Sequence, residues 1–257
     1  MNIKTKKFIK MFIVFLTFFA LPMLVSADDD GYEVVSETSK YYKTVTYYNS
    51  LDKYSIMNSG TPVRSETTEI TKEEYDMASD SGYSTSASTT IEVSYKNMTS
   101  YILSNGSYYR YKNLMVWKSI PSLRSYDIIG IGFPASVKLH GNPILEQEYC
   151  TYDATCSTST ASYKQVFANG AGATFKLASG NLTSLSIRFY FDVEKNTTAT
   201  ITDQDAFSDY AHATSAVLLP TAMQYSVVCN SGIVLSSAAK SYYDSMPVAD
   251  AIWSGTW

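Results

Sequence analysis

The stretch LSIRFYFDVE, residues 185–194, alternates apolar and polar side chains without a break. The odd-numbered positions are apolar and the even-numbered positions are polar: Leu185, Ile187, Phe189, Phe191 and Val193 against Ser186, Arg188, Tyr190, Asp192 and Glu194. Successive side chains of a β-strand point to opposite faces of its sheet, so this pattern predicts a strand with one face in a core and the other in water. Such one-sided strands are typical of antiparallel sheets.

The segments just before this strand also favour extended structure. Ala173–Ala178 and the turn Ser179-Gly180-Asn181 predict a strand that pairs with residues 185–194 as an antiparallel hairpin. Further upstream, residues 125–133 form a near-continuous apolar run, which predicts a strand buried on both faces.

Turn signals separate other strand patterns along the chain. Asn105-Gly106 lies between the runs 101–104 and 108–118, and Asn-Gly between such runs is a strong signal for a tight hairpin. A last hairpin is expected in residues 224–235, with Asn230-Ser231-Gly232 at its tip. Apolar and aromatic residues that alternate with polar ones in residues 32–70 predict one or two more half-buried strands.

Two short segments show helix signals. Thr71-Lys72-Glu73-Glu74 has the spacing of a capping box and predicts a helical turn to about Ala78. Thr202, as an N-cap followed by Asp203 and Asp205 in the first turn, predicts a helix to about Ala213. The small, polar stretch 79–88 between strand signals is expected to be a loop.

These patterns predict an all-β protein with roughly a dozen strands at intervals of about 8 to 15 residues. The expected architecture is an antiparallel β-sandwich, jelly-roll-like or a related two-sheet arrangement, with one or two short peripheral helices. A single domain is expected over residues 28–257, and a boundary near residues 118–124 is the alternative.

The first 27 residues resemble a secretory signal peptide, because four lysines precede an apolar run and the small residues Val25-Ser26-Ala27. Cleavage after Ala27 would leave 16 basic against 24 acidic residues, a formal charge of −8. This balance argues against nucleic-acid binding, which needs cations to neutralise phosphates. No later apolar stretch is long enough to span a membrane, so a secreted, extracellular protein is expected. Whether it stays attached to the cell surface is open.

Export makes disulfide bonds possible among the three cysteines Cys150, Cys156 and Cys229. Cys150 and Cys156 could close a small ring, or one of them could pair with Cys229 across a long loop. Three reduced, buried thiols are the third alternative.

Candidate catalytic residues are few. Glu146 and Glu148 lie two residues apart on an expected strand, so both carboxylates point the same way, an arrangement used in glycosidic acid/base chemistry. Asp205, Asp209 and His212 would share one face of the helix expected at 202–213, where they could bind a hard cation or form an Asp-oriented histidine base. The preferred explanation of the first pair is a solvated strand face, and that of the second group is helix-capping acids with an Asp209–His212 pair. No cofactor motif occurs, so no cofactor is expected.

The aromatic content is the most distinctive property, since the chain has 22 tyrosines. Tyrosines that reach solvent can stack on sugar rings or form a protein contact surface, whereas buried ones only fill a core. The candidates for a binding surface are two adjacent tyrosine pairs and one tryptophan: Tyr108, Tyr109, Tyr242, Tyr243 and Trp117.

The leading hypothesis is therefore a secreted, non-catalytic β-sandwich that acts by surface contact with a glycan, a cell-envelope component or another protein. A carboxylate-dependent, glycan-active hydrolase is the first alternative.

The second alternative is a β-pore-forming toxin, in which residues 79–100 would be the membrane hairpin. A bilayer-crossing strand needs about 9 to 11 alternating residues, and here the alternation is clear only over residues 90–96. There, Ile91, Val93 and Tyr95 share one face, and the polar residues share the other. A surface loop that leads into an ordinary strand explains the same stretch.

Overall fold

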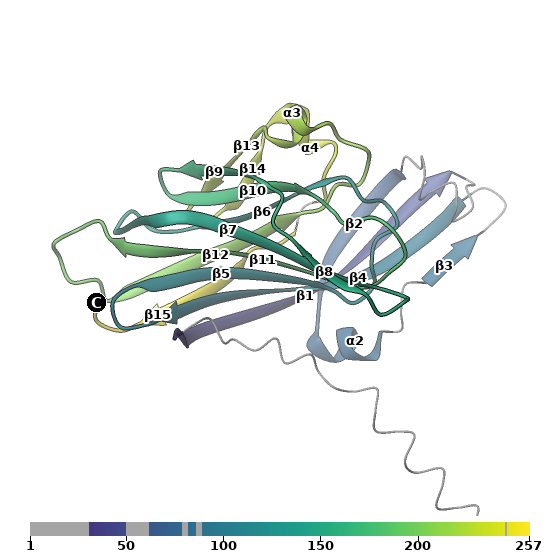
Figure 1. Cartoon of the computed structure of the whole chain (residues 1–257). Helices are drawn as coiled ribbons and strands as arrows, with labels where there is room; N and C mark the ends of the chain where they lie inside the picture. Colours follow the sequence, from purple (N-terminus) through teal and green to yellow (C-terminus); the bar gives the residue numbers. More distant parts are fainter. Residues whose placement is uncertain (1–30, 50–61, 79–81, 86–88, 245) are drawn as a thin grey trace, which may run out of the picture.

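The structure is a computed structural model that describes residues 31–49, 62–78, 82–85, 89–244 and 246–257. The expected signal peptide, residues 1–27, lies outside the described residues. Two antiparallel sheets and a small hairpin account for the named strands (Figure 1), so the predicted all-β, antiparallel sandwich is confirmed.

The larger sheet has the strand order β2-β1-β4-β5-β11-β7-β8, with β3 also paired to β4. Its strands are β1 (Glu33–Asn49), β2 (Pro62–Ile70), β3 (Gly82–Thr85), β4 (Thr89–Ser104), β5 (Tyr109–Trp117), β7 (Val137–Thr151), β8 (Cys156–Ser159) and β11 (Leu182–Lys195). Strands from before and after residues 118–124 therefore pair within one sheet.

The smaller sheet has the order β15-β12-β6-β10-β9, and β13 and β14 form a separate hairpin. These strands are β6 (Tyr126–Gly132), β9 (Tyr163–Phe167), β10 (Gly170–Lys176), β12 (Asp203–Ala211), β13 (Tyr225–Val228), β14 (Gly232–Leu235) and β15 (Ala249–Ser254). The helices are α2 (Lys72–Met77), α3 (Leu219–Ala222) and α4 (Ser237–Lys240). None of the described helices has the length and apolar character that crossing a bilayer requires.

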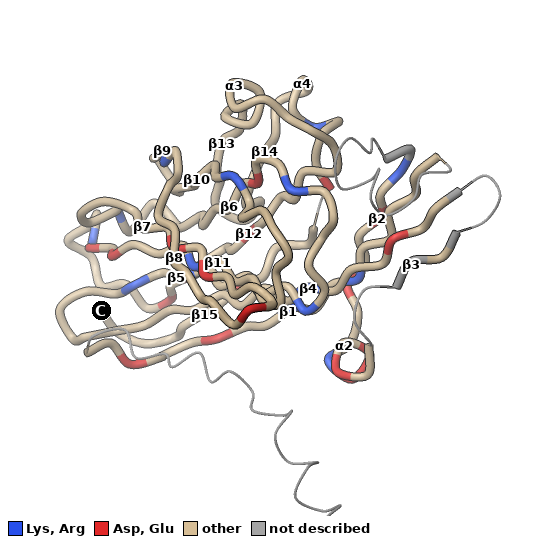
Figure 2. The backbone as a smooth tube through the Cα atoms, turned by 45° about the vertical axis from the view of Figure 1, so that its right-hand side comes forward, with Lys and Arg blue, Asp and Glu red and all other residues tan. Residues whose placement is uncertain are grey.

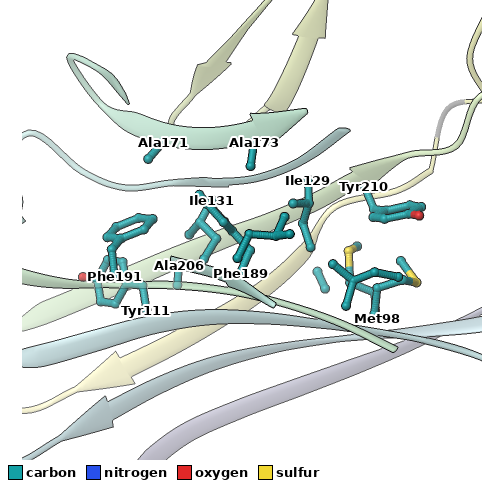
Figure 3. Packing of buried hydrophobic residues seen from close by; sticks show 14 of the residues in the cluster. Met98, Tyr111, Ile129, Ile131, Ala171, Ala173, Phe189, Phe191, Ala206 and Tyr210 are labelled. Atoms are coloured by element: carbon teal, nitrogen blue, oxygen red, sulfur yellow. The ribbon is translucent and has the colours of Figure 1, made fainter. Parts of the chain in front are cut away.

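The core lies between the inner faces of the two sheets (Figure 3). Phe189 and Phe191, on the predicted apolar face of β11, are at most 2% exposed and face the smaller sheet, where Ile129, Ile131 and Ala173 lie. Burial of each such large side chain stabilises the fold by about 1.5–3 kcal/mol. The predicted sidedness of residues 185–194 is thus confirmed.

The β13–β14 hairpin packs on the outer face of the smaller sheet because that face carries glycines. Gly130 is paired with Gly172, and Gly132 with Gly170, on neighbouring strands. A Cβ atom at Gly132 would lie only 2.6 Å from the Val228 carbonyl oxygen, and one at Gly170 would lie 2.6 Å from the Val227 side chain. The backbone of the hairpin therefore approaches the sheet more closely than any residue with a side chain would allow.

Several local predictions are confirmed. Thr71 caps α2 in a capping box with Glu74, and Gly106, at φ +83°, forms the turn between β4 and β5. The hairpin of residues 224–235 is β13–β14, with Asn230 at φ +67° in its turn.

Three predictions are wrong. The expected helix at 202–213 is strand β12, because hydrogen bonding to β6 and β15 and burial of residues 206–211 outweigh the local capping signals. The expected loop 79–88 contains β3, and residues 79–81 and 86–88 lie outside the described part. The segment before β11 does not pair with it, because β10 lies in the smaller sheet between β6 and β9.

Candidate functional site

The polar face of residues 90–96 is the buried one. Glu92, Ser94 and Lys96 are at most 5% exposed on the inner face of β4, whereas Ile91 and Val93 are part-exposed on the outer face. The inner face of the larger sheet is thus apolar in its middle and polar toward the end that carries β2 and β3. Buried polar groups need partners, so this end is where a site is expected.

An ion pair between Lys96 and Asp244 is the centre of this polar region. Lys96 Nζ lies 2.8 Å from Asp244 Oδ2, and the two side chains are 0% and 1% exposed. Thr67 Oγ1 also donates to Oδ2, at 2.9 Å, and the His212 backbone N–H donates to Oδ1 at 2.9 Å. Burial raises the pKa of Asp244, but Lys96 and His212 outweigh burial and hold this pKa below its usual value.

A second buried acid orients the histidine ring. His212 Nδ1 lies 2.8 Å from Asp127 Oδ2, and the Tyr210 hydroxyl donates to the same oxygen at 2.5 Å. The Ala213 N–H donates to Asp127 Oδ1 at 2.9 Å. Burial, with the neighbouring Asp127 charge, raises the pKa of Tyr210 well above its usual value, so this phenol stays protonated. The imidazole is thus held in one orientation by a carboxylate, as a general base requires.

The histidine ring lines a small pocket between β1, β4 and the segment after β5. Tyr48 donates to Glu92 Oε2 at 3.0 Å, and the Ser122 N–H donates to Oε1 at 2.8 Å, so Glu92 has partners on both oxygens. The pocket has a volume of about 10 Å³. It is lined by Thr44, Thr46, Tyr48, Glu92, Ser94, Pro121, Leu123, His212 and Thr214. This volume has room for about one water molecule, so it is too small to hold a substrate against the imidazole.

The outer face of the larger sheet presents a different arrangement, which we call the tyrosine–arginine face: Tyr101, Arg110, Lys112, Tyr190 and Asp192. Cross-strand pairing aligns Tyr101, Lys112 and Tyr190 in one row over β4, β5 and β11, and aligns Arg110 with Asp192 in the next. Arg110 donates to both Asp192 oxygens, at 2.8 and 3.4 Å. Its guanidinium lies 5.0 Å from the Tyr190 ring centroid, and Lys112 Nζ lies 5.6 Å from that of Tyr101.

The first pair of candidate catalytic carboxylates lies beside this face. Glu146 and Glu148, on β7, both contact Arg188 of β11, at 3.4 Å for Glu146 and in a shorter contact for Glu148. A single arginine thus bridges the two acids on an outer sheet face, which is an ion-pair network.

The second candidate group is divided by the fold. On strand β12, Asp205 and Asp209 lie on the outer side of the smaller sheet. His212 follows the strand at an even-numbered position, so its side chain points to the opposite side. The expected shared helical face of these three residues is therefore wrong, because the segment is a strand. Among the described residues, no three His, Cys, Asp or Glu side chains are grouped as a metal site requires.

Asp209 has a separate role in holding the β13–β14 hairpin. Its Oδ2 accepts from the Ile233 N–H at 2.7 Å, and its Oδ1 accepts from the Tyr210 N–H at 2.7 Å. Burial raises the pKa of Asp209 to about 7, although both hydrogen bonds lower it.

Most of the candidate binding aromatics are buried. Tyr109, Trp117 and Tyr243 are 8%, 3% and 8% exposed. Tyr242 is part-buried against the cluster under β13 and β14. Tyr108 is part-exposed and stacks on His140, with ring centroids 4.3 Å apart.

The cysteines form one disulfide bond. Cys150 and Cys156 are joined across β7 and β8, and Cys229 is free and part-buried in the turn between β13 and β14. The structure thus has the small ring, which is one of the three alternatives.

Sequence reasoning missed Glu92, Lys96, Asp127 and Asp244. The alternation at residues 90–96 was the available signal for the first two. Asp127 lies within an apolar run, where a lone acid is a hint of a buried hydrogen-bond network. Asp244 had no local signal.

No protein-family model and no curated protein matches the chain. Two solved structures are similar in part. "BspA_C_WT" is 7% identical with a TM-score of 0.31, and "Streptococcus agalactiae AgI/II polypeptide BspA C terminal domain (WT)" is 8% identical with a TM-score of 0.30. Each comparison covers 67% of this chain and 80% of the other. At these TM-scores the likeness carries no functional statement.

Proposed function

We propose that this protein is exported and binds an extracellular partner, a cell-envelope glycan first and a protein second, through the tyrosine–arginine face. The observation that carries the proposal is the two part-exposed rings of Tyr101 and Tyr190, which lie on either side of Lys112 and beside the Arg110–Asp192 pair. Lys112 itself is 3% exposed. Tyrosine rings stack on sugar rings, and planar guanidinium and carboxylate groups form hydrogen bonds with the sugar hydroxyl groups.

The rigidity of the face supports this proposal. Arg110 is held by both Asp192 oxygens and lies over the rings of Tyr32 and Tyr190, at 4.0 and 5.0 Å from their centroids. Side chains that are fixed before binding lose less conformational entropy when a partner arrives. The three strands beneath them, β4, β5 and β11, pair over long continuous stretches, so the face is a stable platform.

The charge pattern favours a neutral or mixed-charge partner. Figure 2 shows basic and acidic residues interspersed over the larger sheet. Arg110 and Arg188 each contact acids on the same face. A polyanion would need a field of one sign, which this face lacks.

The test uses the mature chain, residues 28–257, with purified cell-wall polysaccharides and cell-envelope fractions. We expect binding to at least one, and we expect Tyr190→Ala to weaken it by about tenfold or more through loss of stacking area. The matched control is Tyr163→Ala, because Tyr163 is 48% exposed on β9 of the other sheet. This variant is expected to bind as the wild type does.

Protease treatment of the envelope fraction separates the two partner classes. Binding that survives the treatment identifies a glycan, and binding that is lost identifies a protein. Equal binding by wild type and Tyr190→Ala would overturn the assignment to this face, and no binding to any fraction would overturn the function.

A further inference from the structure

Lys96 and Asp244 lie next to each other in the folded protein although 148 residues separate them in the chain. Lys96 Nζ is 2.8 Å from Asp244 Oδ2, and neither side chain reaches water. We propose that these two side chains become joined by an amide bond between Lys96 Nζ and Asp244 Cγ. This would be a covalent cross-link between β4 and the segment that leads into β15.

The reaction balances without an oxidant or a co-reactant. One proton moves from the ammonium to Oδ2 along the hydrogen bond, which leaves a neutral amine and a neutral carboxylic acid. The amine lone pair then forms the Nζ–Cγ bond. A second Nζ proton moves to Oδ2, the Cγ–Oδ2 bond breaks, and Oδ2 leaves as water. Burial penalises both charges and so reduces the cost of this step, although Lys96 and His212 still hold the pKa of Asp244 below its usual value.

The groups around Asp244 match the needs of this reaction. The His212 N–H donates to Oδ1 at 2.9 Å, where negative charge develops when the amine attacks Cγ. Thr67 donates to Oδ2 at 2.9 Å, on the oxygen that leaves. The Trp117 ring lies 4.8 Å from Nζ, so the amine is enclosed by an aromatic surface as well as by the acid.

The released water has a place to go. The Thr67 hydroxyl donates its hydrogen bond to Asp244. The Thr44 hydroxyl, whose Oγ1 lies 2.8 Å from Thr67 Oγ1, therefore donates to Thr67. Thr44 and His212 both line the pocket of about 10 Å³ described above. A pocket of this size holds about one water molecule. Thr44 and His212 thus connect the reacting carboxyl group of Asp244, by hydrogen bonds, to a pocket that can hold the released water.

Mass spectrometry of the purified, denatured wild-type protein tests the proposal. The Cys150–Cys156 disulfide is first reduced, so that its two hydrogens do not enter the comparison. We expect a mass one water molecule below that of the reduced mature sequence. Trypsin should leave Lys96 uncut, because its amine is acylated, and should yield peptides 73–110 and 241–257 as one branched product.

Two variants complete the experiment. Lys96→Met is expected to have the full mass of its sequence. Lys40→Met is the matched control, because Lys40 pairs with Glu69 at 3.0 Å in a part-exposed position, and it should keep the loss of one water. A wild-type protein of full mass overturns the proposal. A dehydrated protein that trypsin still cuts after Lys96 also overturns it, since that loss would come from another residue. Neither decisive result depends on a variant that folds.

Discussion

The Asp209 carboxylate reaches across from β12 to the β13–β14 hairpin, where its Oδ2 accepts from the Ile233 N–H at 2.7 Å. A Cβ atom at the adjacent Gly232 would lie 2.5 Å from the same oxygen. The acid is thus enclosed between the smaller sheet and the hairpin, and its ionisation is linked to folding.

We expect Asp209 to make the protein less stable as the pH rises toward neutrality. Its pKa is about 7 in the folded protein against an ordinary value of 3.8, so the folded state holds the proton more strongly. The stability contributed is complete below pH 3.8 and is lost as the pH rises through about 7, by up to about 4 kcal/mol.

Urea unfolding of wild type and Asp209→Asn at about pH 5 and about pH 8 measures this effect. The free-energy difference between the two proteins should favour wild type more at the lower pH. The Lys96–Asp244 pair is common to both proteins, so its own contribution cancels in the comparison. A difference that does not change with pH would contradict the assignment.

Gly132→Ala should destabilise the protein by about 1–3 kcal/mol, because the added methyl group meets the Val228 carbonyl at 2.6 Å and forces the hairpin outward. The midpoint of urea unfolding reports this change. Val234→Ala, on the same hairpin at a side chain 45% exposed, is the control and should stay within about 0.5 kcal/mol of wild type. Wild-type stability in Gly132→Ala would show that the hairpin packs less closely than described.

Lys96→Met removes the proposed amide bond and leaves Asp244 buried without a cation, so it should lower the free energy of unfolding by at least about 3–5 kcal/mol. Lys138→Met removes a cation from an exposed pair with Glu194, and should cost less than about 1 kcal/mol. The double variant Lys96→Met, Asp244→Leu should be more stable than Lys96→Met alone, since it leaves no unpaired charge. Equal stability of the single and double variants would argue against a desolvated carboxylate.

Arg110→Lys should weaken partner binding while it changes stability by less than about 1 kcal/mol. Lysine keeps the charge but loses the two-point contact with Asp192 and the planar stacking on Tyr190. Binding to the envelope fraction and thermal unfolding are measured on the same sample. Binding equal to that of the wild type would show that the fixed position of the Arg110 side chain is not needed for partner binding.

The sequence by itself determined the fold class and the local turns. The alternation in residues 185–194 specifies which side of β11 is apolar, and Asn105-Gly106 specifies a hairpin through backbone preferences alone. The capping box at Thr71 is equally local, since its partner Glu74 is three residues away. Signals of this kind act over a few residues and need no tertiary contact.

Only the tertiary structure decided what each face meets. Residues 90–96 alternate as clearly as β11, yet their polar side is the buried one, because Asp244, Thr67 and the segment after β5 supply partners there. Residues 203–211 carry helix-capping signals but form β12, because β6 and β15 offer hydrogen bonds on both sides. Lys96 and Asp244 are 148 residues apart. Alternation of apolar and polar residues shows that a strand has two different faces. Which of these faces is buried depends on distant segments that only folding brings together.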